Sequence, residues 1–210
     1  AVTTYAYNSC GQVISATNAN GQTTYFSYDA YGNLSILTDS LGNNTSYTYD
    51  ILGRLIKVTD ALNNSTEYNY DKNGNLLNVK DALLSNTTST YNKNGNLSSV
   101  ADPLGNKTSY TYDCFGNLLT VTNALGNTTT SVYDTANQMH LNKANLLSVT
   151  DAKGNRTAYA YDSMGRLITI TDAQSHIVEF TYDSQGNLTY RRDAKGKNAS
   201  YKYDRLNRLW

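Results

Sequence analysis

The sequence predicts an all-β protein, an antiparallel meander of about 20 short strands in a curled or spiralling sheet. Three observations lead to this prediction. A tyrosine-aspartate motif returns at a step of 21 residues and makes ten repeats. A second turn motif, Asp-x-x-Gly-Asn, lies about midway between successive copies. The short segments between turns are rich in Thr, Tyr, Val and Leu, which suits strands and leaves no room for a helix.

The repeated motif has the general form Tyr-Asp-x-x-Gly-(Asn or Arg)-Leu, as in residues 49–55. Repeats of this length stack into quasi-linear arrays, in which each unit contacts mainly its neighbours. We therefore treat residues 1–210 as a single repeat array, with one longer step of 28 residues near its middle. The tyrosine of the motif stands at Tyr7, Tyr28, Tyr49, Tyr70, Tyr91, Tyr112, Tyr133, Tyr161, Tyr182 and Tyr203.

Each repeat has two turns of related sequence, such as Asp29–Asn33 and Asp39–Asn43. An Asp at the first position can accept a hydrogen bond from the backbone two residues on, and a Gly at the fourth supplies a positive φ. This is the pattern of a hairpin loop with a bulge. The chain's one proline, Pro103, fits it, because the second turn position wants φ near −65° and needs no N–H.

The fourth turn position is not always glycine. Asn63 and Asn207 take its place as the residue type that next best tolerates left-handed geometry. Leu84 and Ala144 do not fit, so we expect their turns to be reshaped or strained.

The two strands of a repeat differ in composition. One reads Thr-Ser-Tyr-Thr-Tyr at residues 45–49, and the return strand reads Leu-Ile-Lys-Val-Thr at residues 55–59. If Asp50 pairs with Arg54 across the turn, Tyr49 faces Leu55 in a cross-strand pair. Alternation then places Ile56 and Val58 on the opposite face. Both faces would be partly apolar, and which of them is inward stays open.

About 20 strands at ~4.8 Å each make a sheet of roughly 95 Å. An open twisted sheet of that width is expected to curl or to split into two.

Composition excludes several classes of protein. The 17 acidic residues balance the 17 basic ones, and the chain shows neither the basic excess nor the basic stripe of a nucleic-acid binder, so no nucleic-acid partner is expected. No apolar run approaches the ~18–20 residues of a membrane span. The N-terminus has no signal-peptide pattern, and both ends look cut from a longer array. Cys10 and Cys114 stand five repeats apart, so both should be free thiols.

These motifs resemble the RHS family, also called YD repeats. The family pattern is close to Y-x-Y-D-x-x-G-R-L-x-x-x-T-D-x-x-G-x-x-T. Ten copies in register cover essentially the whole chain, which makes the resemblance specific. Two of them read Tyr47-Thr48-Tyr49-Asp50, Gly53-Arg54-Leu55, Thr59-Asp60 and Tyr159-Ala160-Tyr161-Asp162, Gly165-Arg166-Leu167, Thr171-Asp172.

The resemblance implies a β-sheet that spirals into a hollow shell. In bacterial toxins such a shell encloses a C-terminal toxin, and in animal teneurins a similar shell lies outside the cell. It also implies a secreted or cell-surface protein whose partners are further repeats and an enclosed toxin or effector. The toxin and the family's self-cleaving core are absent from these residues, and the Asp-Pro-Leu-Gly run at 102–105 is better read as a repeat turn.

No catalytic, cofactor-binding or metal-binding residues are predicted, and the chain is not expected to be an enzyme, because no hydrolase, P-loop or zinc motif is present. The aspartate rows are interpreted as turn caps rather than calcium ligands, since one Asp per turn supplies too few oxygens. The tyrosines are interpreted as packing residues, with sugar binding as the alternative. The residues expected to specify the repeat are Tyr28, Asp29, Gly32, Tyr47, Tyr49, Asp50, Gly53, Leu55, Tyr161, Asp162, Gly165 and Leu167.

The 28-residue step isolates a seven-residue insertion, Thr135–Leu141. Insertions in repeat proteins become loops and often bind partners, so Met139 and His140 mark a possible interaction loop. The alternative is a tolerated excursion, because added loop length costs little entropy.

Two functions remain in competition. The first is a structural shell that sequesters a toxin or another polypeptide. The second is an extracellular adhesin or filament that binds glycan or protein through its sheet and self-associates through open strand edges.

Overall fold

The computed structural model describes residues 2–134 and 144–210, and these form strands and turns with no helix. Accordingly, no described segment is a helix that could cross a bilayer. The chain divides into unit 1, Ala1–Asn106, and unit 2, Lys107–Trp210, which are described separately.

Unit 1 contains β1 (Thr4–Tyr7), β2 (Val13–Thr17), β3 (Thr23–Tyr28), β4 (Leu34–Thr38), β5 (Asn44–Tyr49), β6 (Leu55–Thr59), β7 (Ser65–Tyr70), β8 (Leu76–Lys80), β9 (Asn86–Tyr91) and β10 (Leu97–Ala101). Unit 2 contains β11 (Lys107–Tyr112), β12 (Leu118–Thr122), β13 (Thr128–Tyr133), β14 (Leu146–Thr150), β15 (Arg156–Tyr161), β16 (Leu167–Thr171), β17 (Ile177–Tyr182), β18 (Leu188–Arg192) and β19 (Asn198–Ser200).

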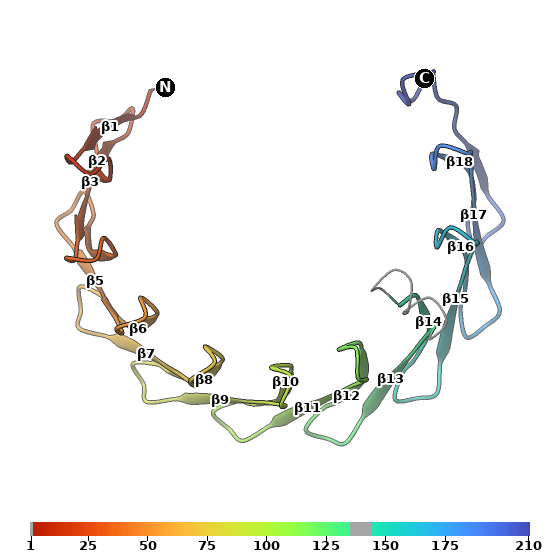
Figure 1. The fold of residues 1–210 in the computed structure, drawn as a ribbon, viewed down its shortest axis with the longest axis horizontal. Helices are drawn as coiled ribbons and strands as arrows, with labels where there is room; N and C mark the ends of the chain where they lie inside the picture. Colours follow the sequence, from red (N-terminus) through yellow and green to blue (C-terminus); the bar gives the residue numbers. More distant parts are fainter. Residues whose placement is uncertain (1, 135–143) are drawn as a thin grey trace. The chain divides into compact units, whose positions relative to one another are not determined.

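Each unit is a simple meander. Within unit 1, every strand pairs antiparallel with the strand before it and the strand after it. The same holds within unit 2. Figure 1 shows the strands of each unit following one another along a curved band. The predicted all-β antiparallel meander is confirmed.

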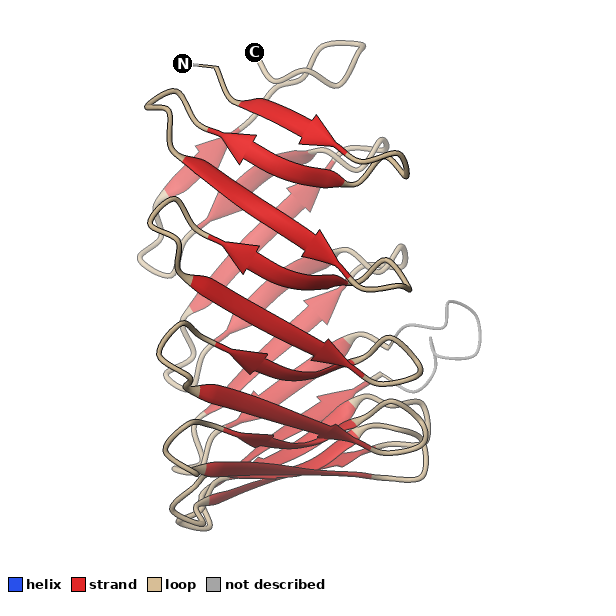
Figure 2. Cartoon of the chain, turned by 90° about the vertical axis from the view of Figure 1, so that its left-hand side faces the viewer, coloured by secondary structure: helices blue, strands red, loops and turns tan. Residues whose placement is uncertain are grey.

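The two kinds of turn lie at opposite edges of the sheet. Turns that follow a tyrosine strand, such as Asp50–Arg54, form one edge, which we call the Tyr-Asp edge. Turns that follow a return strand, such as Asp60–Asn64, form the other, which we call the Thr-Asp edge. Figure 2 shows the turns gathered in two columns, one at each end of the strands.

A β-bulge next to each Tyr-Asp turn sets the register. Asp50 N–H donates to Arg54 O at 2.9 Å, and Tyr49 pairs with Leu55, as predicted. The register then shifts by one residue, so Thr48 pairs with Lys57 and Tyr47 with Val58. The expectation that Val58 turns away from the tyrosines was therefore wrong, because the extra residue of a bulge resets the alternation of the strand.

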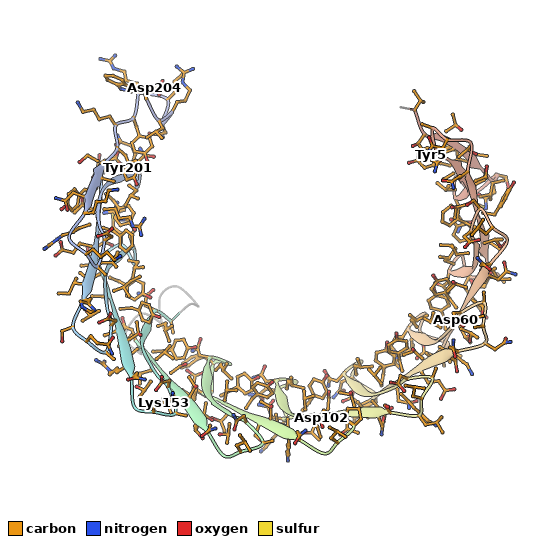
Figure 3. All side chains as sticks on the ribbon, turned by 180° about the vertical axis from the view of Figure 1, so that it is seen from behind. Tyr5, Asp60, Asp102, Lys153, Tyr201 and Asp204 are labelled. Atoms are coloured by element: carbon orange, nitrogen blue, oxygen red, sulfur yellow. The ribbon has the colours of Figure 1, made fainter. Side chains whose placement is uncertain are left out.

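As a consequence, one sheet face is aromatic and aliphatic and the other is polar. Tyr47, Tyr49, Leu55 and Val58 share the first face, and Thr48 with Lys57 lies on the second. Figure 3 shows the aromatic rings along the concave side of each unit, with Tyr5 and Tyr201 labelled. This answers the question that the sequence left open. In each unit the tyrosine face is the inner one.

The sheet has a single layer and no closed core. Among the described residues, no hydrophobic side chain is fully buried, and the two buried residues are Ser99 and Ser148. The motif tyrosines from Tyr28 to Tyr203 and the motif leucines from Leu34 to Leu188 are half-buried instead, whereas Tyr7 and Leu209 at the two ends are exposed. The concave face of each unit is thus an apolar surface that nothing within the same unit covers.

Candidate functional site

The turn aspartates are the most heavily bonded side chains of the repeat. In the turn that begins at Asp29, Oδ1 accepts the backbone N–H groups of Tyr31 and Asn33, each at 2.9 Å. Oδ2 accepts Nδ2 of Asn33 at 3.0 Å. Asp50 repeats the arrangement with Leu52 and Arg54. The sequence predicted the bond to the second residue on, and the structure adds two more from the fifth turn position.

These bonds stabilise the ionised carboxylate. The side-chain hydrogen bond from Asn33 holds the pKa of Asp29 below its ordinary value, with help from backbone N–H groups. For Asp162, the backbone N–H of Arg166 is the main cause of a lowered pKa. Since both oxygens of these carboxylates already accept donors, they serve the turn. Within the described residues, no group of three or more His, Cys, Asp or Glu side chains could hold a metal ion.

The fourth turn position has a left-handed backbone, as predicted. Gly32, Gly53 and Gly165 have φ of 86°, 75° and 75°. The described non-glycine residues with positive φ are Asn63, Leu84, Ser175 and Asn207. Leu84 has φ 63° and still donates to Asp81 O at 3.0 Å, so this turn keeps its shape and is strained rather than remodelled.

In five repeats the hydroxyl of the motif tyrosine joins its repeat to the one before it. The ladder between β6 and β7 begins only at Lys57, so the bulge leaves the Leu55 carbonyl without a strand partner there. Tyr70 Oη donates to that carbonyl at 2.9 Å. The equivalent bonds join Tyr28 to Val13, Tyr91 to Leu76, Tyr161 to Leu146 and Tyr182 to Leu167, at 2.7–3.0 Å.

This bond was missed in reading the sequence, which treated the tyrosine as a rung of an aromatic ladder. The one ring-to-ring contact among the described residues joins Tyr5 and Tyr7, at 6.5 Å between centroids. A signal was present, however. The motif position is tyrosine in all ten repeats, whereas the other aromatic position also accepts Phe26, Phe180, Ser89 and Ser131. A position that never accepts phenylalanine needs its hydroxyl.

Arginine at the fifth turn position makes a second link between repeats. Arg54 Nε donates to Asp50 Oδ2 at 2.7 Å, and its Nη1 donates to Asp71 O of the next turn at 2.9 Å. Its guanidinium also lies 4.9 Å from the ring centroid of Tyr70. Arg166 repeats all three contacts with Asp162, Asp183 and Tyr182. The planar, forked guanidinium suits such multiple contacts.

The cysteines, the histidines and the insertion are the remaining candidates from the sequence. Cys10 and Cys114 are free and exposed, as predicted. His176 Nδ1 lies 2.8 Å from Asp172 Oδ2, in the place that asparagine or arginine takes in other turns. Met139, His140 and the insertion 135–141 lie outside the described residues, and on either side of the undescribed segment Asp134 N–H donates to Asn145 O at 2.8 Å.

Charge is sorted between the two faces. The strand-borne charges Lys57, Glu67, Lys80, Lys107, Arg156, Glu179 and Arg192 all lie on the convex face by register. On the concave face, Arg191, paired with Phe180, is the one charged residue within the described strands. From β1 to β17, the described strands of both units therefore carry no charged side chain on the concave face.

The overall charge balance does not hold locally. Residues 190–210 contain two aspartates and seven cations, which leaves ten cations against fifteen carboxylates in the rest of the chain. All seven cations are exposed, and those in described ion pairs are Arg192 with Glu179 and Arg208 with Asp204. They are Arg191, Arg192, Lys195, Lys197, Lys202, Arg205 and Arg208.

Comparison with known proteins places this repeat. The teneurin YD-shell family model matches residues 84–210, and the RHS-repeat model matches residues 7–43, 28–65 and 49–83. The chain belongs to the RHS/YD-repeat family. No match was found among curated protein sequences.

Solved structures agree with this family in fold. This YD-repeat chain is similar to the crystal structure of TcdB2-TccC3-TEV, with a TM-score of 0.56 and 17% identity, and to that of TcdB2-TccC3, with 0.56 and 16%. It is also similar to a mutant Tc holotoxin pore of Photorhabdus luminescens, with 0.54 and 14%. Each match covers 99% of this chain but only 14–15% of the other, so the chain spans about a seventh of those proteins.

Proposed function

We propose that this chain is a wall segment of an RHS-type shell, and that its work is to wrap and sequester a toxin or another polypeptide. The observation that carries the proposal is the concave face. Its strand residues are aromatic and aliphatic and carry no charge from β1 to β17, and nothing within the same unit covers them. Apolar surface left in water is unfavourable, so such a face favours an occupant.

The repeats themselves do no chemistry under this proposal. The turn carboxylates are engaged with their own loops, as Asp29 and Asp50 illustrate. The partners are further YD repeats and the enclosed polypeptide, and the setting is secreted or at the cell surface. The likeness in fold to the Tc holotoxin pore of Photorhabdus luminescens supports the container, because that assembly is a toxin.

Two substitutions that introduce a charge test the container proposal. Val58→Arg places a cation on the concave face, which can hold one at this position because β18 carries Arg191 at the equivalent place. Thr48→Arg places the same charge on the convex face of the neighbouring strand, where Thr48 pairs with Lys57. The two substitutions introduce the same side chain on neighbouring strands and differ in the face they alter.

The assay is fluorescence anisotropy of a labelled, reduced and unfolded α-lactalbumin chain, together with its protection from protease. We expect Val58→Arg to weaken binding at least about 10-fold, through loss of apolar contact and burial of a charge. Thr48→Arg should leave binding unchanged. Equal binding by the two variants, or no protection by the unaltered chain, would contradict the container.

A second candidate function has one observation in its favour. Tyr25 is 55% exposed on the convex face, beside a hollow of about 600 Å³ that Thr23, Thr38 and Asp39 also line. An exposed ring next to polar groups suits a sugar. Binding in a glycan array that Tyr25→Ala abolishes would support an adhesin, and an array with no binding would remove it.

A further inference from the structure

One corner of unit 2 gathers positive charge at the concave face. It lies where β18 runs into the Thr-Asp turn that begins at Asp193. Arg191 on β18, together with Lys195 and Lys197 in the turn, supplies three cations, and all three residues are exposed. We call these three residues the basic corner. Because Arg191 is the one charged residue on the concave side of the described strands, this corner differs in charge from the rest of that face.

The fold does not require a cation at the place of Arg191. In the earlier return strands the equivalent residue, which pairs with the same position of the strand before it, is apolar. These residues are Ala16, Leu37, Val58, Val79, Val100, Val121, Val149 and Ile170. The arginine therefore replaces an apolar side chain that the rest of the sheet uses.

The turn does not require a lysine at the place of Lys197 either. Most other Thr-Asp turns have asparagine there. Asn43, for example, donates from Nδ2 to Asp39 Oδ2 at 2.8 Å, which adds a side-chain bond to the turn. Lys197 makes no such bond among the described residues, so this turn has a free cation in place of a stabilising contact.

The charge of the corner is only partly offset. None of its three side chains is in an ion pair with a described residue. Asp193 Oδ1 accepts the backbone N–H groups of Lys195 and Lys197 at 2.9 and 2.8 Å. The N–H of Lys197 is the main cause that lowers the pKa of Asp193, and the nearby charges of Arg191 and Lys197 add to it. One ionised carboxylate thus stands among three cations.

Arg191 and Lys197 line one hollow. Its volume is about 230 Å³, and Asp193, Asn198 and Ala199 complete its lining. A guanidinium offers a planar fork of donors and an ammonium offers a compact charge, and both suit the oxygens of a carboxylate. Since Arg191 pairs with Phe180, the apolar part of the concave face begins directly beside the hollow.

We propose that the basic corner docks an acidic segment, rich in Asp and Glu, of the polypeptide that the wall encloses. This proposal rests on the container function and gives the chemistry of the occupant at one place. The apolar part of the polypeptide lies along the aromatic face of unit 2, and its carboxylates meet Arg191 and Lys197. Exposed ion pairs contribute little to affinity, so the corner fixes where the occupant lies more than how strongly it binds.

Two other anionic partners fit the corner less well. A nucleic acid carries charge along its whole length, and outside residues 190–210 the acidic residues of this chain outnumber the basic ones and would repel it. A membrane surface is broad and flat, whereas Arg191 lies on a concave face. A short acidic segment in an otherwise neutral polypeptide needs positive charge only at the corner.

Fluorescence anisotropy of the full chain with two labelled peptides tests the proposal. Both peptides share one stretch of alternating leucine and serine, and they end in four glutamates or in four glutamines. At low ionic strength the chain should bind the glutamate peptide about 10-fold more tightly. This preference should disappear near 1 M NaCl, where the screening length is about 3 Å.

The corner can be neutralised with residues that the chain already uses at the same places. The triple variant combines Arg191→Val, Lys195→Gln and Lys197→Asn. These changes copy Val149, Gln174 and Asn155. The variant should bind both peptides equally well, because the apolar face is unchanged.

A matched control removes three cations of the same repeat that lie away from the corner. It combines Lys202→Thr, Arg205→Ser and Arg208→Asn, which copy Thr181, Ser184 and Asn187. The control has the same net charge as the corner variant, and it should keep the preference for glutamate.

Charge reversal shows that a loss of binding does not come from misfolding. Arg191→Glu with Lys197→Glu should reverse the preference, so that a third peptide, which ends in four lysines, binds more tightly than the glutamate peptide.

Four results would overturn the acidic-segment proposal. Equal binding of the glutamate and glutamine peptides by the unaltered chain would remove it and leave the container in place, whereas binding of neither peptide would remove both. A preference that survives in the corner variant, or that the control abolishes, would assign it to other cations. Tighter binding of oligothymidylate, or of phosphatidylserine vesicles, that depends on the corner would assign the corner to nucleic acid or to a membrane.

Discussion

Tyr70→Phe isolates the hydroxyl that ties one repeat to the next. The substitution keeps the ring, and with it the contact to the Arg54 guanidinium 4.9 Å away, but removes the donor to Leu55 O at 2.9 Å. A lost hydrogen bond costs about 0.5–1.5 kcal/mol, and up to about 3 when a buried acceptor is left unpaired. Because Tyr70 and Leu55 are half-buried, we expect a loss near 1 kcal/mol.

The same strand provides the control. Tyr68 stands at the aromatic position where the chain elsewhere uses Phe26 and Phe180, so Tyr68→Phe should change stability by less than about 0.5 kcal/mol. Urea denaturation followed by circular dichroism compares the two variants. The triple variant of Tyr28, Tyr70 and Tyr91 to phenylalanine should lose about three times as much, since the three bonds share no partner. Equal stability of Tyr70→Phe and Tyr68→Phe would refute the assignment of the hydroxyl.

Three further perturbations test the turns. Arg54→Lys should destabilise the chain by about 1–2 kcal/mol in urea denaturation, because an ammonium cannot reach Asp50, Asp71 O and the Tyr70 ring together. Arg208→Lys is the control. The described side-chain bond of Arg208 stays within its own turn, so this substitution should cost clearly less. Leu84→Gly should raise stability by about 1 kcal/mol, because glycine adopts φ 63° without strain. Gly105→Ala, at φ 83°, should lower stability. A lower melting temperature for Leu84→Gly, or a higher one for Gly105→Ala, would contradict the strain. The pKa values of Asp29, Asp39, Asp60 and Asp71 are lowered in the folded chain. The stability that these carboxylates contribute is fully present above the pKa of an unfolded aspartate, near 3.9, and is lost as pH falls through the folded pKa values. The melting temperature should therefore be flat down to about pH 5 and fall below about pH 4. Turns that begin with Asn8 or Asn92 make the same backbone bonds without a titrating group, so replacing the four aspartates by asparagine should flatten that fall.

The local chemistry of the repeat could be predicted because it depends on residues close in sequence. Asp29 and Gly32 specify their turn within five residues, and the turn then places Tyr49 opposite Leu55. The face of Val58 could not be obtained in this way. A bulge adds one residue to one strand, and simple alternation beyond it gives the wrong face.

Features that join different repeats were the harder ones. The Tyr70 hydroxyl and the Arg54 guanidinium act on residues 15 and 17 positions away, where no turn rule applies. Curvature was expected from the width of the sheet, but its direction follows from side-chain packing over many strands. The Leu84 strain, in contrast, was visible in the sequence, because leucine stands where the turn demands a left-handed residue.

The links between repeats also bear on the order in which the repeats fold during synthesis. Tyr70 belongs to the later repeat and donates back to Leu55, which the ribosome releases first. Every described strand pair within a unit joins consecutive strands, so a new hairpin needs only the one before it as a template. Each hairpin closes over about 20 residues of chain. This closure is fast compared with synthesis, which proceeds at ≈ 5–20 residues per second. We therefore expect the repeats to fold one at a time from the N-terminus, and tyrosines such as Tyr70 to bond each new hairpin to the repeat before it during synthesis.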